Sequence, residues 1–589
     1  MLRHWGSWFF LGILTLVVFP VDSAAARPNV ILITLDSTRA DRMGFLGARR
    51  GLTPNLDQVA QQGLVFAQAF AQAPVTVVST ATILTGAYPQ THQASEFGVP
   101  LASTLPYLPD LLRGGGYRTA AFVGSILLDP RSGPFQAYDR GFDVYDAGFH
   151  QPQRGESRFQ SVERHGDQVV TGAIHWLAAN KQRPLFLWVH LQDPHAPYVS
   201  YDRAIAAADA AVGKLVRFLR SQSLYDDSLI VVASSQGESL GAHEEDTHGI
   251  FLYDETIHVP LVLKLPQNQM AGKQVKNRAR LLDIAPTVLA EAGLPIPARM
   301  QGQSLMRVAQ SSPQADQPVY GRSELSRLGF GCGIIESWRA GKYLYIRAPK
   351  PELYDLSLDP NATHNLAQSA KATLATMASQ LQSLDSYLTN ETGKSTTSGL
   401  TSSEMQKLAS LGYVGLQKGG TGVNASTEGA DPKDNIATIN RTLAAFLELD
   451  DGKPEKAIPV FAAQPTTYFA QFGMGSALIQ QQQFAEAIGF LHKAIELEPD
   501  STWAHYQMGL SLMKTGEFKT SVVHLEIAAG RLPGFSALHS LLAEVYEHLG
   551  RSSDAARERA RAGVGDKQSN ERLPSPSRRM DELIFVLGW

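Results

Sequence analysis

The polar side chains that could do chemistry follow directly after apolar runs of the chain. Asp36 follows residues 30–35, His195 lies just past residues 185–191, and Ser235 with Gln236 follows residues 229–233. In open α/β sheets, ligands bind beyond the carboxyl ends of the strands. Carboxylate and imidazole groups are ligands for metal ions, whereas a serine hydroxyl and a glutamine amide are weak ligands for a divalent cation. We therefore expect a polar site at this edge of a sheet.

The surrounding pattern predicts the elements that position these side chains. Most of the strand candidates are apolar at consecutive positions, which indicates burial on both faces, as in a parallel sheet covered by helices. The candidates are residues 30–35, 120–123, 185–191, 229–233 and 261–265. Helices are predicted between them, at residues 55–62, 105–113, 168–179 and 205–221. This alternation predicts an α/β fold with a mostly parallel central sheet.

Composition and charge exclude several classes of protein. The chain has 589 residues, of which 44% are hydrophobic and 18% are charged, and this excludes a wholly disordered protein. There are 52 Lys and Arg residues against 56 Asp and Glu residues, so the formal net charge is −4. Without a basic run there is no electrostatic footprint for nucleic acid. The single cysteine, Cys332, excludes an intramolecular disulfide and a cysteine-based zinc site.

Residues 1–26 have the pattern of a signal peptide. The apolar run from Trp8 to Phe19 is too short to span a bilayer, which needs about 20 residues. Ser23 to Ala26 then supply the small side chains that signal peptidase requires. We expect an exported protein, periplasmic or extracellular, with no membrane span after cleavage. A buried core helix or an uncleaved anchor is the alternative.

Two changes of character mark the C-terminal part. Residues 389–433 contain stretches rich in Gly, Ser and Thr, which predict a flexible linker. A short helix at residues 403–411 interrupts the linker, and we expect it to dock on the rest of the chain. From residue 434 to residue 565 the chain is helical and repetitive, and residues 566–589 form a C-terminal tail.

The repeats have a fixed period. Gly475, Gly509 and Ala543 are each 34 residues apart, as are Pro499 and Pro533. A 34-residue period with small residues where helices cross is the signature of tetratricopeptide repeats. A poorer match at residues 452–457 predicts a further repeat at the start of the array. An unrelated helical bundle is the alternative.

A series of motifs resembles the sulfatases of the alkaline phosphatase superfamily. The motifs run in the family's order at residues 28–39, 53–57, 84–86, 193–198, 237–241, 248–249, 283–287 and 352–356. Residues 408–415, Leu-Ala-Ser-Leu-Gly-Tyr-Val-Gly, resemble the tail of sulfatase-like proteins that carry tetratricopeptide repeats. The resemblance implies a sulfatase-like domain over residues 27–388. Such enzymes use a cation and a hydroxyl nucleophile to cleave sulfate or phosphate esters.

The resemblance also assigns site residues. Asp36 matches the first metal ligand, Thr76 the nucleophile, and His195 and His248 the groups that contact the ester oxygens. Thr76 is expected just before a helix at residues 79–84, where free backbone N–H groups favour anions. True sulfatases carry Cys or Ser at this position, for oxidation to formylglycine. A Thr nucleophile resembles the phosphoester and phosphonate branch instead.

Several family residues are missing from this chain. The Asp-His pair of metal ligands falls at Ser235 and Gln236, and a second Asp position falls at Ser37. The Arg or His expected at Thr80 is also absent. Asp36 therefore remains as a remnant of the metal site.

Two functions stay open. The first is a non-catalytic pseudoenzyme that has lost its metal and whose array binds a protein partner. Its Asp36, without a cation, should have a raised pKa or accept a hydrogen bond from Thr76, Gln236 or a backbone N–H. The second is a hydrolase of a small anionic sulfate, phosphate or phosphonate ester that uses Thr76 and a divalent cation (Mn, Ca, Mg or Zn). Its lost ligands would be replaced by nearby acidic residues: Glu238, Glu244, Glu245 or Asp246.

Overall fold

The computed structural model describes residues 27–94, 101, 103–130, 138–148, 164–180, 184–195, 200–312, 316–392, 402–411, 413 and 428–564. The predicted signal peptide at residues 1–26 and the tail at 566–589 lie outside the described residues. So do residues 393–401 and 414–427, which hold most of the Gly- and Ser-rich sequence of the predicted linker.

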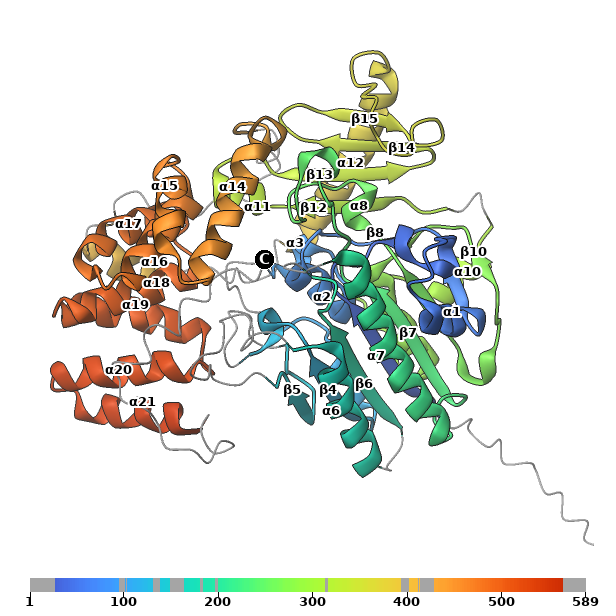
Figure 1. Ribbon diagram of the computed structural model, residues 1–589, viewed down its shortest axis with the longest axis horizontal. Helices are drawn as coiled ribbons and strands as arrows, with labels where there is room; N and C mark the ends of the chain where they lie inside the picture. The colour runs from blue at the N-terminus through green and yellow to red at the C-terminus, as the bar shows by residue number, and fades with distance from the viewer. Residues whose placement is uncertain are drawn as a thin grey trace, which may run out of the picture.

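A central sheet forms the core of the N-terminal domain (Figure 1). Within the described residues it has eight strands, in the order β10 (Gln274–Val275), β2 (Leu64–Phe66), β9 (Leu261–Lys264), β7 (Ser228–Ser234), β1 (Asn29–Leu35), β6 (Leu185–Leu191), β4 (Arg118–Val123) and β5 (Val144–Asp146). β1 pairs in parallel with both β6 and β7, and β4 pairs in parallel with β6 and β5. The predicted mostly parallel sheet is therefore confirmed.

Helices cover both faces of this sheet, which explains the continuous apolar strands. In β1, Ile31 and Ile33 pack on the face covered by α1 (Pro54–Gln61), α6 (Gly166–Ala179) and α7 (Tyr201–Ser221). Val30 and Leu32 pack on the opposite face, with α2 (Thr76–Thr85), α4 (Leu108–Gly114) and α9 (Ile284–Glu291). Because every side chain of the strand is buried, the sequence shows no alternation.

β9 runs against its neighbours. It pairs antiparallel with β7 and with β2, so the sheet is mixed at this side. A parallel strand needs a long crossover, usually through a helix that covers a face of the sheet. The connection from residue 235 to residue 260 holds only short elements: a turn of helix at Ala242–Glu244, α8 (Asp254–Ile257) and the two-residue strand β8 (His258–Val259). The chain therefore returns beside β7 in the opposite direction.

Two smaller sheets complete the domain, and the sequence pattern did not predict them. β11 (Ala279–Arg280), β3 (Ala69–Phe70) and β8 (His258–Val259) form one. β12 (Val319–Ser323), β13 (Ile335–Ala340), β14 (Tyr343–Arg347) and β15 (Glu352–Asp355) form an antiparallel sheet against α12 (Lys371–Thr392). Short helices α3 (Pro89–His92), α10 (Leu305–Gln310) and α11 (Leu325–Phe330) lie between these elements.

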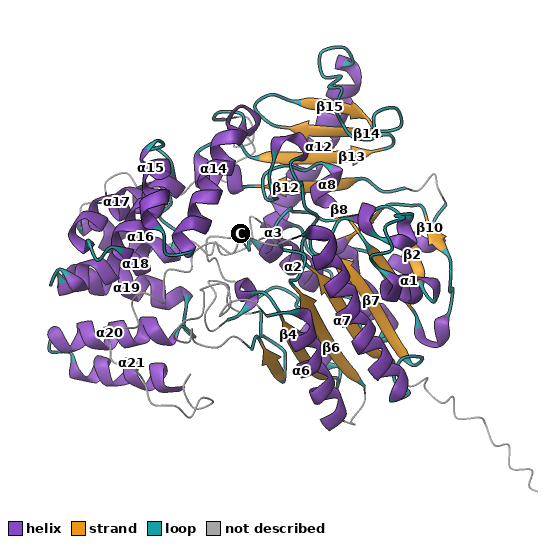
Figure 2. Cartoon of the chain, viewed as in Figure 1, coloured by secondary structure: helices purple, strands orange, loops and turns teal. Residues whose placement is uncertain are grey.

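The C-terminal part is an array of paired antiparallel helices (Figure 2). The pairs are α14 (Pro432–Asp450) with α15 (Pro454–Ala462), α16 (Tyr468–Gln480) with α17 (Phe484–Leu497), α18 (Thr502–Lys514) with α19 (Phe518–Arg531), and α20 (Ser536–His548) with α21 (Ser552–Val564). A Cβ atom added to Gly475 would lie 2.7 Å from Leu491, and one added to Gly509 would lie 2.5 Å from Leu525. The predicted small residues therefore do lie where paired helices cross.

The array is attached to the α/β domain by several contacts. The rings of Phe330 in α11 and Phe469 in α16 meet edge to face, with centroids 5.1 Å apart. In α14, the Asn440 side chain donates to the Glu244 carbonyl (2.7 Å) and accepts from the Asp246 N–H (3.4 Å). The Lys433 ammonium pairs with Glu352 in β15. Across the described ranges, we find no helix with the length and apolar character needed to cross a bilayer.

Candidate functional site

The carboxyl ends of three parallel strands meet at Asp36. The Asp36 N–H donates to the Leu191 carbonyl at the end of β6 (2.8 Å), and the Ser235 N–H donates to the Leu35 carbonyl (2.9 Å). The loops after β1, β6 and β7 are thus held together, as expected for neighbouring parallel strands. The Asp36 side chain is completely buried between them.

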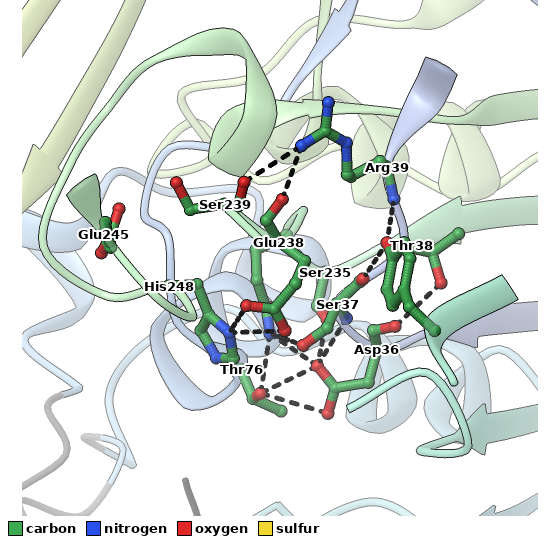
Figure 3. Close-up of polar contacts among 12 residues, drawn as sticks. Asp36, Ser37, Thr38, Arg39, Thr76, Ser235, Glu238, Ser239, Glu245 and His248 are labelled. Atoms are coloured by element: carbon green, nitrogen blue, oxygen red, sulfur yellow. Dashed lines mark hydrogen bonds and ion pairs between the residues drawn. The ribbon is translucent and has the colours of Figure 1, made fainter. Parts of the chain in front are cut away.

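Thr76 approaches the same carboxylate from α2. Its hydroxyl lies 2.9 Å from Oδ1 and 3.1 Å from Oδ2 of Asp36 (Figure 3). The sequence placed Thr76 just before the helix, but α2 begins at Thr76 itself, three residues earlier than predicted. The β-branched run from Thr76 to Val78 has weak helix propensity, and burial of the whole of α2 overrides it.

Gln236 lies among three oxygen atoms. Its Nε2 is 2.6 Å from Asp36 Oδ1, 3.0 Å from Thr76 Oγ1 and 3.2 Å from Ser37 Oγ. The Ser235 hydroxyl (3.1 Å) and the Ser37 N–H (3.0 Å) also lie within hydrogen-bond distance of Asp36 Oδ1. The expectation that Asp36 accepts hydrogen bonds from Thr76, Gln236 or a backbone N–H is therefore confirmed.

The other expected outcome, a raised pKa of Asp36, is not found. Burial by itself raises the pKa of this carboxyl. The hydrogen bond from His190 and the positive charges of His195, His190 and His248 outweigh burial and hold the Asp36 pKa well below its ordinary value. The carboxylate stays ionised in its buried position.

His190 is a site residue that the sequence reasoning missed. It lies within β6, and its Nε2 is 3.3 Å from Asp36 Oδ2. Thr34 Oγ1 accepts a hydrogen bond from Trp188 Nε1 (2.9 Å) and lies 2.9 Å from His190 Nδ1. Because an ionised carboxylate can only accept, His190 Nε2 carries a proton that it donates to Asp36. The available signal was a single ionisable side chain inside an otherwise apolar strand.

The two predicted histidines lie together. The rings of His195 and His248 meet edge to face with centroids 5.1 Å apart. His248 Nδ1 is 3.3 Å from both carboxylate oxygens of Glu238, and both residues are buried. Burial lowers the His248 pKa, but the charge and hydrogen bond of Glu238, with the charges of Asp36 and Glu245, raise it above its ordinary value. The contact with Glu238 therefore favours the cationic form of this buried imidazole.

Of the acidic residues considered as replacement ligands, Glu238 and Glu245 direct their carboxylates at other groups. Glu238 faces His248, and Glu245 accepts hydrogen bonds from the N–H groups of Ile250 (2.7 Å) and Phe251 (3.3 Å). Burial raises the Glu245 pKa to about 8. Glu245 lies apart from Asp36 in Figure 3. The Glu244 and Asp246 backbones bind Asn440.

The donor set does not fit a divalent cation. Within the described ranges, no group of three or more His, Cys, Asp or Glu side chains is arranged to hold a metal ion. The amide nitrogen of Gln236 is directed at the oxygens that such an ion would need. Two further buried oxygens, Gln236 Oε1 and Thr80 Oγ1, have no hydrogen-bond partner among the described residues. Thr80 occupies the position where the family resemblance led us to expect Arg or His.

Comparison with known proteins supports the fold and the family of the N-terminal domain. Residues 28–294 match the family model described as Sulfatase, and residues 247–387 match that of the N-sulphoglucosamine sulphohydrolase C-terminal region. Residues 475–516 match a TPR repeat. The chain thus contains a sulfatase-family domain of the alkaline phosphatase superfamily, followed by tetratricopeptide repeats.

Individual relatives are distant. An ulvan-active sulfatase of Formosa agariphila is 23% identical over 393 residues, covering 58% of this chain and 77% of that protein. A delta 4,5-hexuronate-2-O-sulfatase of Bacteroides thetaiotaomicron is 24% identical over 436 residues, covering 62% and 90%. The crystal structure of a phosphonate monoester hydrolase of Agrobacterium radiobacter superposes with a TM-score of 0.52 at 21% identity, covering 62% of this chain and 96% of that one. That structural likeness establishes the fold.

Proposed function

We propose that this chain is an exported, non-catalytic member of the sulfatase family whose repeat array binds a protein partner. The observation that carries the proposal is the position of Gln236 Nε2, within 3.2 Å of oxygens of Asp36, Thr76 and Ser37. A neutral amide nitrogen there donates a hydrogen bond to the buried Asp36 carboxylate at a place where a metal-dependent relative would need a cation.

Electrostatics support this reading. Divalent cations such as Ca²⁺ and Mg²⁺ bind through several hard oxygen ligands, with carboxylates prominent among them. Asp36 is the carboxylate at this site, and Ser235 and Gln236 are neutral where the family has an Asp-His pair. Thr76 donates a hydrogen bond to Asp36 (2.9 Å), and a carboxylate whose pKa is held low is a weak base for removing the hydroxyl proton.

A second function, metal-dependent hydrolysis of a sulfate, phosphate or phosphonate ester, keeps one specific observation in its favour. Asp36, Thr76, His195 and His248 gather in one buried cluster, joined by hydrogen bonds, a ring contact and electrostatic attraction. In this reading Asp36 would hold a divalent cation (Mn, Ca, Mg or Zn) in place of its hydrogen bond from Gln236, and such a cation supplies charge that favours attack by a hydroxyl on an anionic ester.

Metal binding distinguishes the two functions. The experiment compares the natural chain with the double variant Ser235→Asp/Gln236→His, which returns a carboxylate and an imidazole to the site. Manganese or calcium at 100 times Kd should stabilise the double variant by about 2.7 kcal/mol and raise its Tm. The natural chain should show no rise in Tm and no stoichiometric metal.

The matched control makes the same two changes at exposed positions of the same domain, as Ser369→Asp/Gln382→His. It should behave as the natural chain does. If the natural chain contains stoichiometric metal, or responds to manganese as strongly as Ser235→Asp/Gln236→His, the pseudoenzyme proposal is wrong and the hydrolase is preferred.

A further inference from the structure

A segment of the predicted linker is docked on the repeat array. Helix α13 (Ser402–Ser410) packs against α19, and its Leu408 side chain is fully buried. The Tyr413 N–H donates to the Leu408 carbonyl (3.2 Å), so the chain folds back at the end of this helix. Tyr413 is only 2% exposed. The buried Leu408 and Tyr413 side chains therefore anchor the segment to the array, although the sequence predicts a flexible linker here.

Tyr413 packs against His492 and His524, and His505 lies behind His524; we call these three histidines the Tyr413 socket. Its ring stacks on His492 of α17, with centroids 4.2 Å apart and planes 13° from parallel. It meets His524 of α19 edge to face at 5.6 Å. Beside the socket, Lys407 pairs with Glu526 of α19 (3.1 Å). The segment therefore bridges the second helices of two successive repeats.

The hydrogen bonds below Tyr413 have a defined direction. The Pro499 carbonyl can only accept, so His505 Nε2, 3.0 Å away, carries a proton. Neutral His505 then accepts at Nδ1 from His524 Nδ1 (2.9 Å). The free Nε2 of His524 in turn accepts from the Tyr413 hydroxyl, at 3.5 Å. Burial lowers the pKa of both histidines, which keeps them neutral as this chain requires.

The neighbouring repeat provides an internal comparison. One period later, His539 takes the place of His505 and likewise lies 2.9 Å from a proline carbonyl, that of Pro533. Its partner at the position of His524 is Glu558, 2.6 Å from His539 Nδ1. A carboxylate there would satisfy His505 equally well. Unlike a carboxylate, His524 also has a second ring nitrogen, Nε2, which lies 3.5 Å from the Tyr413 hydroxyl.

We propose that the face formed by α17 and α19 is a peptide-binding site for a short helix followed by a tyrosine, and that residues 402–413 are its built-in ligand. In the sequence the docked segment lies between the α/β domain and the first repeat, and in the structure it is attached to α19. A partner peptide with the same pattern, a leucine five residues before a tyrosine, would compete for this site. The proposal is independent of whether the Asp36 site is catalytic.

Proteolysis of the full chain tests the docking. Trypsin cleavage after Lys407, followed by mass spectrometry, reports how often α13 leaves the array. We expect Tyr413→Ala to accelerate this cleavage by about tenfold or more, because it removes a buried ring. His524→Glu should also accelerate it while preserving the array, since the next repeat uses that same pair. Tyr387→Ala, at a 53% exposed tyrosine of α12, is the control and should leave cleavage unchanged.

Binding in trans tests the site itself. A fluorescent peptide with the sequence of residues 402–415 should bind the Leu408→Ala/Tyr413→Ala chain and should bind the natural chain at least about tenfold more weakly, because the socket is filled. The same peptide with Ala in place of its tyrosine should not bind. Equal cleavage after Lys407 in the natural and Tyr413→Ala chains, or failure of the peptide to bind the double variant, would overturn the proposal.

Discussion

The side-chain nitrogen of Gln236 lies 2.6 Å from Oδ1 of Asp36, a short hydrogen bond between two completely buried residues. An amide nitrogen carries two hydrogens, yet three oxygens surround this one. The geometry resembles that of a small cation among its ligands, with the partial positive charge of an amide in place of the full charge of an ion.

The first prediction concerns this contact. Gln236→Leu keeps the approximate size of the side chain but removes a donor from Asp36. We expect a loss of about 1–3 kcal/mol in the free energy of unfolding, measured by urea denaturation. Gln382→Leu, at an exposed position of α12, should change it by less than about 0.5 kcal/mol. Equal effects of the two substitutions would show that the hydrogen bond contributes nothing.

The second prediction concerns helix crossing in the array. Gly509→Leu places a large side chain where a Cβ atom alone would lie 2.5 Å from Leu525. Overpacking of this kind costs about 1–3 kcal/mol. Gly530→Leu, in α19, introduces the same side chain where a Cβ atom meets nothing within 4 Å. The thermal unfolding of the array should shift for the first variant only, and an unchanged Tm would show that the crossing tolerates the side chain.

The third prediction concerns pH below neutrality. Burial lowers the pKa of His505 to about 4 from an ordinary value of 6.5. The unfolded chain therefore takes up a proton at higher pH than the folded chain does. The stability that neutral His505 confers is complete above pH 6.5 and is lost as the pH falls toward 4.

The matched variant is His505→Gln, because Gln471 at the equivalent position of the preceding repeat binds the Pro465 carbonyl with its amide. It should retain a hydrogen bond to Pro499 while losing the titratable group. Denaturation of both proteins between pH 4 and pH 6.5 is the measurement. A slope that is identical in the two proteins would assign the acid sensitivity to other residues.

The fourth prediction concerns pH on the alkaline side and has the opposite sign. Burial raises the Glu245 pKa to about 8, from a model-compound value of 4.5. The stability that the protonated carboxyl confers is complete below pH 4.5 and is lost as the pH rises toward 8. Glu245→Gln should flatten the decline in Tm between pH 5 and pH 8. If the natural chain and the variant decline alike, the carboxyl is ionised in the folded protein.

The fifth prediction concerns the N-terminus. If residues 1–26 are a cleaved signal, the protein recovered from outside the cytoplasm should begin near Arg27. Intact mass and N-terminal peptide analysis provide the measurement. A secreted protein that still carries Met1 would contradict cleavage, and a protein confined to the cytoplasm would contradict export.

Much of the fold could be predicted because its signals are periodic or continuous. The apolar runs of β1, β6 and β7 and the 34-residue step from Gly475 to Gly509 are patterns of this kind. The predicted start of α2 was wrong because tertiary burial outweighs the weak helix propensity of Thr76 and Val77. No local sequence pattern records such burial. The direction of β9 depends on how the connection from β7 is routed, and a strand sequence does not encode that.

The candidate site divides in the same way. Asp36, Thr76, Ser235 and Gln236 could be placed by motif, and the structure brings them into contact. His190 lies inside an apolar strand, where its role depends on which neighbour faces it. The Tyr413 socket depends on contacts between residues about 80 to 110 positions apart in the chain. Such a pairing becomes visible only when the array is folded.

The hydrogen bonds around Asp36 have a consequence for how the protein matures. Where a structural cation completes a buried site, folding waits on capture of that ion, and chelators reverse it. Here Gln236, Ser235, Thr76 and the Ser37 N–H come from the chain itself, so the carboxylate is satisfied as soon as the three strand ends meet. If Asp36 binds no cation, as we propose, the domain reaches its final structure in an environment depleted of divalent ions.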